Sequence, residues 1–393
     1  MKITDVVPYV LLAPNYDIGK TSSAQDSFVL EIRTDEGLVG IGETDANPWI
    51  MKACIEAPGT HTMSRGIKQL VVGADPLEIS ALMRRLYVGT AMDGRRGALI
   101  HALGAVEMAL WDLKGKALGR PVYELLAEET GHPLRTGVTP YASLQPSGAS
   151  WEEYRDSLVA WALRAKEMGF RAVKAEVTMN GPYAHSGLSV PYDRHTDVIA
   201  AVRKALGPDV DLMVDVQYMF DDFDSCAAVV RDWKEFNLFF LETPIWVDNL
   251  DDYGKLHDAG LMPIAMGEWL TTRHEFAEAM DRGKLDVVQP DVGRVGGLLE
   301  TLAVADAAAE RGRLVVPHCW KTGISISATV HMALVTPHCP YVEYLPPQIC
   351  EEVLRRELVT EDLSLVDGSV PAPTKPGLGI ELNRDAVKRF QVA

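Results

Sequence analysis

The sequence has little positive charge. Across 393 residues, 38 lysines and arginines stand against 55 aspartates and glutamates, which gives a net charge of −17. A protein that binds nucleic acid needs a basic surface to neutralise phosphates, so this balance argues against a nucleic-acid partner. If the natural ligand is an anion, a few local groups must hold it.

Long apolar runs and paired cysteines are also missing. No apolar run reaches the roughly 18 to 20 residues of a membrane helix. The first residues, MKITDVVPYVLL, alternate like a strand and lack the cleavage site of a signal peptide, so we expect no membrane partner and no export. An odd number of scattered cysteines without a Cys-x-x-Cys pair argues against a disulfide framework and a zinc site, and fits a cytoplasmic location. They are Cys54, Cys226, Cys319, Cys339 and Cys350.

The pattern of strand-like and helical segments divides the chain into three parts. Residues 1–130 combine strand-like stretches with helical segments, one of which ends on Gly119. From 131 to 365, short apolar runs alternate with amphipathic helices about every 25 to 30 residues, as in repeated βα units. Residues 366–393 look like a segment that returns to the first part. We therefore expect a barrel domain over 131–365 and an α+β capping domain built from the two ends.

Eight apolar runs in the middle part are candidate strands. Strands in this number, alternating with helices, predict an α/β fold: a (β/α)7–8 TIM-type barrel, with the last unit the most weakly marked. In such barrels the active site lies at the carboxyl ends of the strands. The runs are VTPYAS, AVKAEV, VDLMVDV, LFFLE, MPIAMGE, DVVQPD, RLVVPH and YVEY.

Ionisable residues close seven consecutive runs. One such residue alone would usually be a solvated charge at a strand end, but an unbroken series is hard to obtain that way. In chain order the residues are Lys174, Glu176, Asp215, Glu242, Glu268, Asp291, His318 and Glu343.

Three of these carboxylates point to a metal. Asp215, Glu242 and Glu268 close successive strands, so they should converge on one point, where they would repel each other unless a cation lay between them. An all-oxygen ligand set that leaves positions open for water and substrate suits Mg²⁺, whereas zinc prefers His or Cys. The spacing therefore predicts a magnesium site.

Asp291 and His318 close the next two runs. A carboxylate beside an imidazole fixes its tautomer and raises its basicity, which makes His318 a candidate general base. The alternative is a histidine beside Pro317 that is satisfied structurally and has no catalytic role. Glu343 should face the same mouth, where it could hydrogen-bond a substrate oxygen if protonated.

These residues resemble the enolase superfamily and, within it, the mandelate racemase group. The matching stretches are LMVDVQ, FLETP, AMGE, VVQPDVGRVGG, VVPHCW and YVEY, and the resemblance extends over nearly the whole chain. It implies that Asp215, Glu242 and Glu268 bind Mg²⁺, which would hold the substrate carboxylate while an enediolate forms. It also implies that His318, paired with Asp291, is the base on one face of the substrate carbon.

The stretch AVKAEVTMN departs from that group. Lys174 matches the first lysine of its Lys-x-Lys motif, but Glu176 replaces the second lysine, the base on the other face; Gln217 also stands where many relatives carry asparagine. Strand alternation puts Lys174 and Glu176 on one face, so we expect Glu176 either to pair with Lys174 or to have a raised pKa. A plain structural ion pair between the two is the alternative.

A single base favours dehydration over racemisation. A racemase needs a competent base on each face, whereas in a dehydration His318 could remove the proton next to the carboxylate and later protonate the leaving β-hydroxyl. We therefore predict a Mg²⁺-dependent dehydratase of acid sugars that yields 2-keto-3-deoxy acids, with Lys174 holding the substrate carboxylate and Glu176 accepting hydrogen bonds from a sugar hydroxyl. We also expect a small-molecule substrate and a homo-oligomer.

Two other functions stay open. One is an isomerase of the same superfamily, either a sugar-lactone cycloisomerase or an epimerase in which Glu176 replaces the missing lysine. The other is a catalytically silent, metal-dependent sugar-acid binder. His185 and His195 lie in a long insert after the second barrel run and are expected to be surface residues of that loop.

Overall fold

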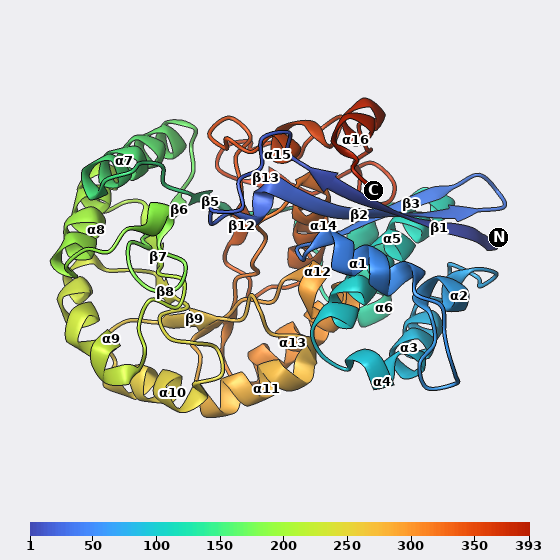
Figure 1. The fold of residues 1–393 in the computed structure, drawn as a ribbon, viewed down its shortest axis with the longest axis horizontal. Coiled ribbons are helices and arrows are strands. Elements are labelled where there is room, and N and C mark those ends of the chain that lie inside the picture. The colour runs from blue at the N-terminus through green and yellow to red at the C-terminus, as the bar shows by residue number, and fades with distance from the viewer.

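The computed structural model describes residues 1–393, and its first part is a three-stranded antiparallel sheet covered by helices (Figure 1). The apolar side chains of its strands are buried against the long helix α5, which ends at the left-handed Gly119 (φ 67°). The elements are β1 (Ile3–Leu12), β2 (Asp26–Thr34), β3 (Val39–Thr44), α1 (Pro48–Glu56), α2 (Ile67–Val71), α3 (Ile79–Gly89), α4 (Ala91–Gly94), α5 (Ala98–Leu118) and α6 (Val122–Thr130).

The second part is a curled sheet of eight parallel strands, as the sequence predicted. The strand order is β11-β10-β9-β8-β7-β6-β5-β12, so the last strand lies beside the first of the set and no ladder joins β11 to β12. The strands are β5 (Pro140–Leu144), β6 (Ala172–Glu176), β7 (Asp211–Asp215), β8 (Phe240–Glu242), β9 (Ile264–Met266), β10 (Val287–Val288), β11 (Leu314–Val315) and β12 (Val342–Tyr344).

Helices surround this sheet on the outside (Figure 1). The unit after β12 is the weakest, since its helix α15 has 5 residues. The helices are α7 (Trp151–Glu167), α8 (Asp193–Leu206), α9 (Phe223–Val230), α10 (Leu250–Ala259), α11 (Thr272–Arg282), α12 (Val292–Val295), α13 (Leu298–Glu310), α14 (Gly323–Ala333) and α15 (Val353–Glu357). No helix is long and apolar enough to cross a membrane.

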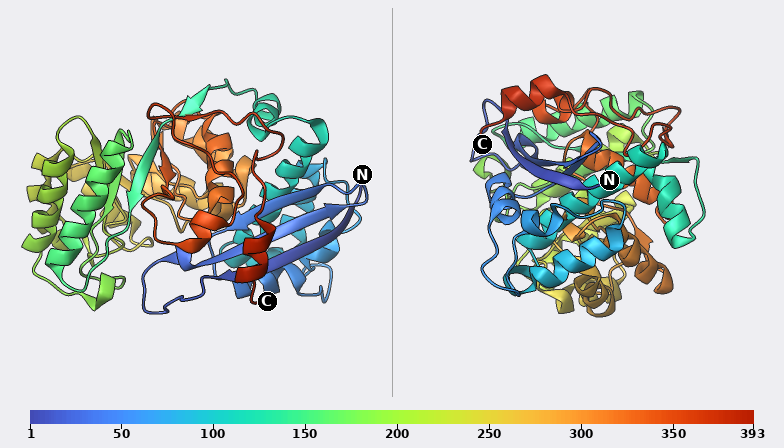
Figure 2. Two further views of the ribbon diagram at one scale, coloured as in Figure 1. Left: turned by 90° about the horizontal axis from the view of Figure 1, so that it is seen from above. Right: turned by 90° about the vertical axis from the view of Figure 1, so that its right-hand side faces the viewer.

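The end of the chain lies against its beginning. Helix α16 (Arg384–Phe390) crosses the first sheet (Figure 2), and the backbone N–H of Val10 donates to the carbonyl of Ala393 over 3.1 Å. Another late segment, β13 (Val370–Pro371), pairs antiparallel with β4 (Gly137–Val138). The division of the chain at residues 130 and 365 stays a prediction, because these contacts cross both limits.

A small apolar layer inside the curled sheet explains why polar groups gather at one mouth. It consists of Tyr141, Ala172, Met213, Phe240, Ala265, Val287 and Val316, all buried. Strand residues two positions apart point to the same side, so the inward-facing positions after Ala172, Met213, Phe240 and Val316 are Lys174, Asp215, Glu242 and His318. The apolar layer closes the floor beneath these groups, which leaves them facing the carboxyl-end mouth.

Candidate active site

One cavity of about 270 Å³ brings most of the predicted site residues together. It opens at the carboxyl ends of the strands, and residues 20–23 of the loop between β1 and β2 also line it. The predicted residues in its wall are Lys174, Glu176, Asp215, Glu268, His318 and Glu343. Glu242 and Asp291 do not line it but lie directly behind, in contact with Lys174 and His318 respectively.

The strands hold some of these residues and the loops beyond them hold the rest. Lys174, Glu176, Asp215, Glu242 and Glu343 lie within strands, and Glu176, Asp215 and Glu242 are register neighbours on β6, β7 and β8. Glu268, Asp291 and His318 lie two or three residues beyond β9, β10 and β11. Asp291 is the N-cap of α12, whose backbone N–H groups at Gly293 and Arg294 donate to its carboxylate.

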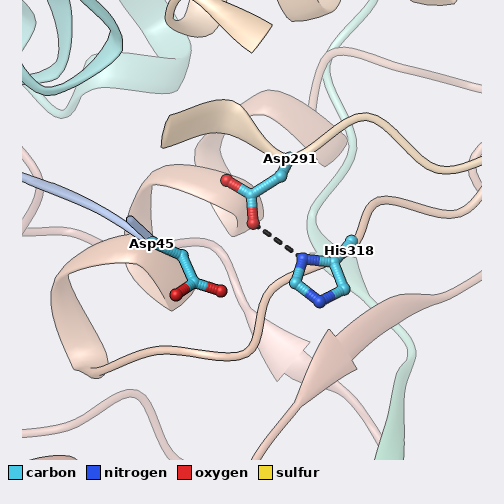
Figure 3. Close-up of side chains that lie close together, drawn as sticks. All are labelled: Asp45, Asp291 and His318. Atoms are coloured by element: carbon cyan, nitrogen blue, oxygen red, sulfur yellow. Dashed lines mark hydrogen bonds and ion pairs between the residues drawn. The ribbon is translucent and has the colours of Figure 1, made fainter. Parts of the chain in front are cut away.

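His318 and Asp291 form the hydrogen-bonded pair that the sequence suggested (Figure 3). The Nδ1 of His318 lies 2.8 Å from Oδ2 of Asp291, and both side chains are buried. Burial alone would lower the pKa of His318, but the carboxylate of Glu343 and the hydrogen bond that His318 donates to Asp291 outweigh it and raise the pKa to about 9. Asp291 occupies Nδ1, so Nε2, which lies 3.4 Å from Oε2 of Glu268, is the atom available for proton exchange.

Lys174 does not pair with Glu176, so the first of the two alternatives, an ion pair between them, was wrong. Its ammonium lies 3.0 Å from Oε2 of Glu242 and 2.8 Å from Oε1 of Glu343. Burial would lower the pKa of Lys174, but these carboxylates raise it well above its ordinary value. Lys174 is therefore a buried cation that neutralises carboxylates on β8 and β12, each two strands away from its own strand β6.

The surroundings of Glu343 favour its ionised form. Burial would raise its pKa, but Lys174 and His318 lower it to about 2. The carboxylate accepts hydrogen bonds from the Ser143 hydroxyl over 2.6 Å and from the Cys319 backbone N–H over 2.6 Å. The predicted hydrogen bond from a protonated Glu343 to a substrate oxygen stays a prediction, which the lowered pKa disfavours.

Glu176 pairs instead with His185, which the sequence placed on the surface of the insert. The Nε2 of His185 contacts Oε1 of Glu176, and His185 is 8% exposed. His195 is also buried, in α8 against Tyr192, so the surface expectation was wrong for both histidines. Periodicity could not have placed His185, because it lies in a loop; the unpaired carboxylate at the strand end was the signal available.

The predicted metal ligands suit a hard cation in chemistry. Burial, and then repulsion from Glu242, raises the pKa of Asp215 well above its usual range; burial also raises that of Glu242. A cation among these carboxylates would relieve that cost. The side-chain oxygen of Gln217, which lines the same cavity, is buried without a hydrogen-bond partner and could be satisfied in the same way.

A different trio has the closest ligand atoms. Those of Asp45, Asp291 and His318 lie within 4.8 Å of one another (Figure 3), whereas Asp215, Glu242 and Glu268 form no such cluster. Two cations already serve Asp45: Arg294 forms an ion pair with it, and the Lys321 ammonium lies 3.1 Å away. Despite burial, they hold the pKa of Asp45 well below its usual range. Asp45 thus has two cationic partners of its own, and we interpret its trio as part of an ion-pair network.

Comparison with known proteins agrees with this fold. The model described as "Enolase C-terminal domain-like" matches residues 157–386, and "Mandelate racemase / muconate lactonizing enzyme, N-terminal domain" matches residues 3–127. The fold and site thus define a member of the enolase superfamily. Within it, the chain belongs to the mandelate racemase/muconate lactonizing enzyme family.

Similar proteins share nearly the full length of the chain. D-galactarolactone cycloisomerase from Agrobacterium fabrum is 31% identical over 93% of this chain and 91% of its own. D-galactonate dehydratase from Xanthomonas campestris pv. campestris is 30% identical over 92% and 90%. The crystal structure of 3,6-anhydro-D-galactonate cycloisomerase from Zobellia galactanivorans matches with a TM-score of 0.85 at 27% identity, covering 100% of each chain.

Proposed function

We propose that the protein is a Mg²⁺-dependent hydro-lyase that dehydrates acid sugars to 2-keto-3-deoxy acids. The observation that carries the proposal is the His318–Asp291 pair at a cavity that also presents buried carboxylates from neighbouring strands. Glu176 stands where the family resemblance would put a second lysine base. A site with one histidine base suits an elimination better than inversion at one carbon.

Asp215, Glu242 and Glu268 would hold the Mg²⁺. When bound, the cation supplies positive charge that stabilises the negative charge developing on the substrate carboxylate. Lys174 would stay beside Glu242 and present its charge to the same side of the cavity, as its 3.0 Å contact suggests. This keeps the net charge of the buried carboxylates low enough for an anionic substrate to enter.

His318 would act as the base. Its Nδ1–H donates to Asp291, and once Nε2 has lost its own proton, the Nε2 lone pair can take the proton on the carbon next to the carboxylate. The β-hydroxyl then leaves as water and the resulting enol becomes the 2-keto-3-deoxy acid. For the β-hydroxyl to leave as water, a proton must reach its oxygen.

An acid-sugar substrate agrees with both the relatives and the cavity. The similar proteins are named for galactonate, galactarolactone and anhydrogalactonate. The cavity wall carries hydroxyl and amide groups from Thr21, Ser23, Ser143, Gln145 and Gln217, which can hydrogen-bond a polyol chain. The homo-oligomeric state and the cytoplasmic location stay predictions.

A lactone cycloisomerase is the second candidate. Two of the similar proteins are cycloisomerases, one of them the most identical of the three described above. A cycloisomerase needs the same removal of the proton next to the carboxylate by His318. It would instead expel a ring oxygen, so that no water is lost.

The test is an activity screen with Mg²⁺ against C5 and C6 aldonates, aldarates and their lactones, in D₂O. Formation of a 2-keto-3-deoxy acid supports the dehydratase, whereas isomerisation of a lactone without loss of water supports the cycloisomerase. Deuterium incorporation without either product indicates an epimerase. Mg²⁺-dependent binding with no turnover would overturn both proposals and leave a sugar-acid binder.

A further inference from the structure

A buried histidine–carboxylate pair lies beside the proposed substrate cavity and has no part in the mechanism above. Glu176 lines the cavity, and behind it the Nε2 of His185 contacts its Oε1. Both side chains are buried, with His185 8% and Glu176 6% exposed. Burial would lower the pKa of His185, but the Glu176 carboxylate outweighs it and raises it.

Contacts from α7 and from the residues just after β6 hold this pair in place. The Tyr154 hydroxyl, from α7, donates to the carbonyl of Glu176 over 2.8 Å and accepts from the Thr178 N–H over 2.7 Å, which fixes the end of β6. The ring of Tyr154 also packs edge-on against His185, with centroids 5.8 Å apart. His185 in turn donates its backbone N–H to the carbonyl of Thr178 over 3.0 Å. These contacts fix the backbone on both sides of the pair.

Strand order places the pair across the cavity from the proposed base. Glu176 ends β6 and His318 follows β11, and the strands between them are β7 to β10. In a curled sheet these positions face each other over the mouth, with the carboxylates of Asp215 and Glu268 between them in the order of strands. A substrate held by that middle group would thus have His318 on one side and Glu176 on the other.

His185 also reaches a second cavity, of about 320 Å³, next to the first. The two cavities share Lys20, Thr21, Ser143, Gln145 and Trp320 in their walls. Glu176 lines only the first and His185 only the second. The pair thus bridges the proposed substrate cavity and a separate polar space from which protons can be resupplied.

We infer that Glu176 is the proton donor to the leaving β-hydroxyl and that His185 positions and recharges it. This inference rests on the proposed dehydratase function and adds a second proton carrier on the face opposite His318. Elimination is then anti, whereas a single histidine serving both steps would make it syn. In this inference His318 removes the proton but does not protonate the leaving hydroxyl. The His318–Asp291 pair supplies the base, and the Glu176–His185 pair supplies the acid.

The protons and electrons balance without another reactant. His318 takes the proton from the carbon next to the carboxylate, and that bonding pair forms the new double bond as the β-carbon–oxygen bond breaks. Glu176 gives its proton to the departing oxygen, which leaves as water, and His185 returns a proton to Glu176. The enol then ketonises: it gains a proton at the β-carbon from His318 and loses one from its oxygen to the solvent, which recharges His185.

The experiment compares two leaving groups in three proteins. The proteins are the wild type, Glu176→Gln and His185→Gln, whose amide can still donate a hydrogen bond to Glu176 but cannot supply its proton. The probes are D-galactonate, or the aldonate that the wild type dehydrates fastest, and its 3-deoxy-3-fluoro analogue. Fluoride needs no proton to depart, so its release measures every step except the proposed one. Exchange of the α-proton in D₂O is followed on the same samples.

We expect kcat for dehydration to fall roughly 100-fold or more in both variants, the usual contribution of a general acid. Fluoride release and α-proton exchange should change by less than about tenfold. Equal losses with both leaving groups would show a structural role for the pair and overturn the inference, as would dehydration at the wild-type rate. If the wild type dehydrates none of the acid sugars, the proposed function itself fails and the inference falls with it.

Discussion

The ammonium of Lys174 lies 3.0 Å from Oε2 of Glu242, on the neighbouring side of the same mouth, and not against Glu176 two residues along its own strand. Lys174 therefore neutralises a carboxylate that we assign to the metal. Both side chains are buried. Without Mg²⁺, Lys174 is therefore the main positive charge available to Glu242.

Replacing Lys174 should consequently make folding depend on Mg²⁺. In Lys174→Met, the buried charges of Glu242 and Glu343 lose their partner, which typically costs about 3 to 5 kcal/mol. Urea unfolding in EDTA should show that loss, and saturating Mg²⁺ should restore more stability to the variant than to the wild type. Equal gains from Mg²⁺ in the two proteins would contradict the assignment of Glu242 to the metal.

Mg²⁺ binding can distinguish the proposed ligand set of Asp215, Glu242 and Glu268 from the trio that contains Asp45. Asp215→Asn removes a charge from the proposed ligands, so calorimetric titration should show at least about tenfold weaker binding. Asp45→Asn is the matched control, since Asp45 belongs to the closest trio but already contacts Arg294 and Lys321. Weaker Mg²⁺ binding in Asp45→Asn and unchanged binding in Asp215→Asn would place the metal at the other trio.

The first part of the chain should control the catalytic pair through one close helix contact. A Cβ on Gly104, in α5, would lie 2.2 Å from the carbonyl oxygen of Gly293, in the short helix capped by Asp291. Gly104→Ala should thus displace α12, destabilise the protein by about 1 to 3 kcal/mol or more and lower kcat. Leu118→Ala, in the same helix but with Leu118 50% exposed, is the control. Unchanged activity in a folded Gly104→Ala would separate the two parts functionally.

Acid should destabilise the protein through a buried histidine, His331, which does not line the proposed substrate cavity. Burial lowers the pKa of His331 to about 4 from an ordinary value of 6.5, so the unfolded chain binds a proton that the folded protein refuses. Its contribution to stability is present above pH 6.5 and is lost as the pH falls toward 4, by roughly 3 kcal/mol. Unfolding free energies of the wild type should fall across this range.

His331→Asn separates that effect from general acid denaturation. The Nδ1 of His331 accepts a hydrogen bond from the Tyr123 backbone N–H over 3.1 Å, and the amide oxygen of asparagine can accept it without titrating. The stability of the variant should depend less steeply on pH between 6.5 and 4. Parallel curves for the two proteins would show that His331 is not the group responsible.

The sequence predicted the barrel and its polar mouth well because both follow from alternation. Each inward residue of the apolar layer is followed two positions later by another inward residue. The positions of Met213 and Phe240 therefore predict that Asp215 and Glu242 point inward. The His318–Asp291 pair was accessible for the same reason, since both residues closely follow adjacent strands. Helix ends marked by glycine, such as the end of α5 at Gly119, could also be predicted from the sequence.

Partners across the mouth could not be predicted in this way. Lys174 and Glu176 share a strand face, yet each pairs with a residue on another element. Lys174 pairs with Glu242, two strands away, and Glu176 pairs with His185, which lies in a loop with no periodicity. Which carboxylates stay apart also depends on their neighbours. The ion pairs of Lys174 and Arg294 hold Glu242 and Glu268 in positions that alternation alone does not specify.

The most direct test of the account is the rate at which wild type and His318→Asn form 2-keto-3-deoxy acid from the acid-sugar panel in D₂O with Mg²⁺. We expect turnover by the wild type, and both dehydration and α-proton exchange to fall by roughly 100-fold or more in His318→Asn, since it lacks the base. Dehydration by His318→Asn at the wild-type rate would contradict the account, because the base would then lie elsewhere.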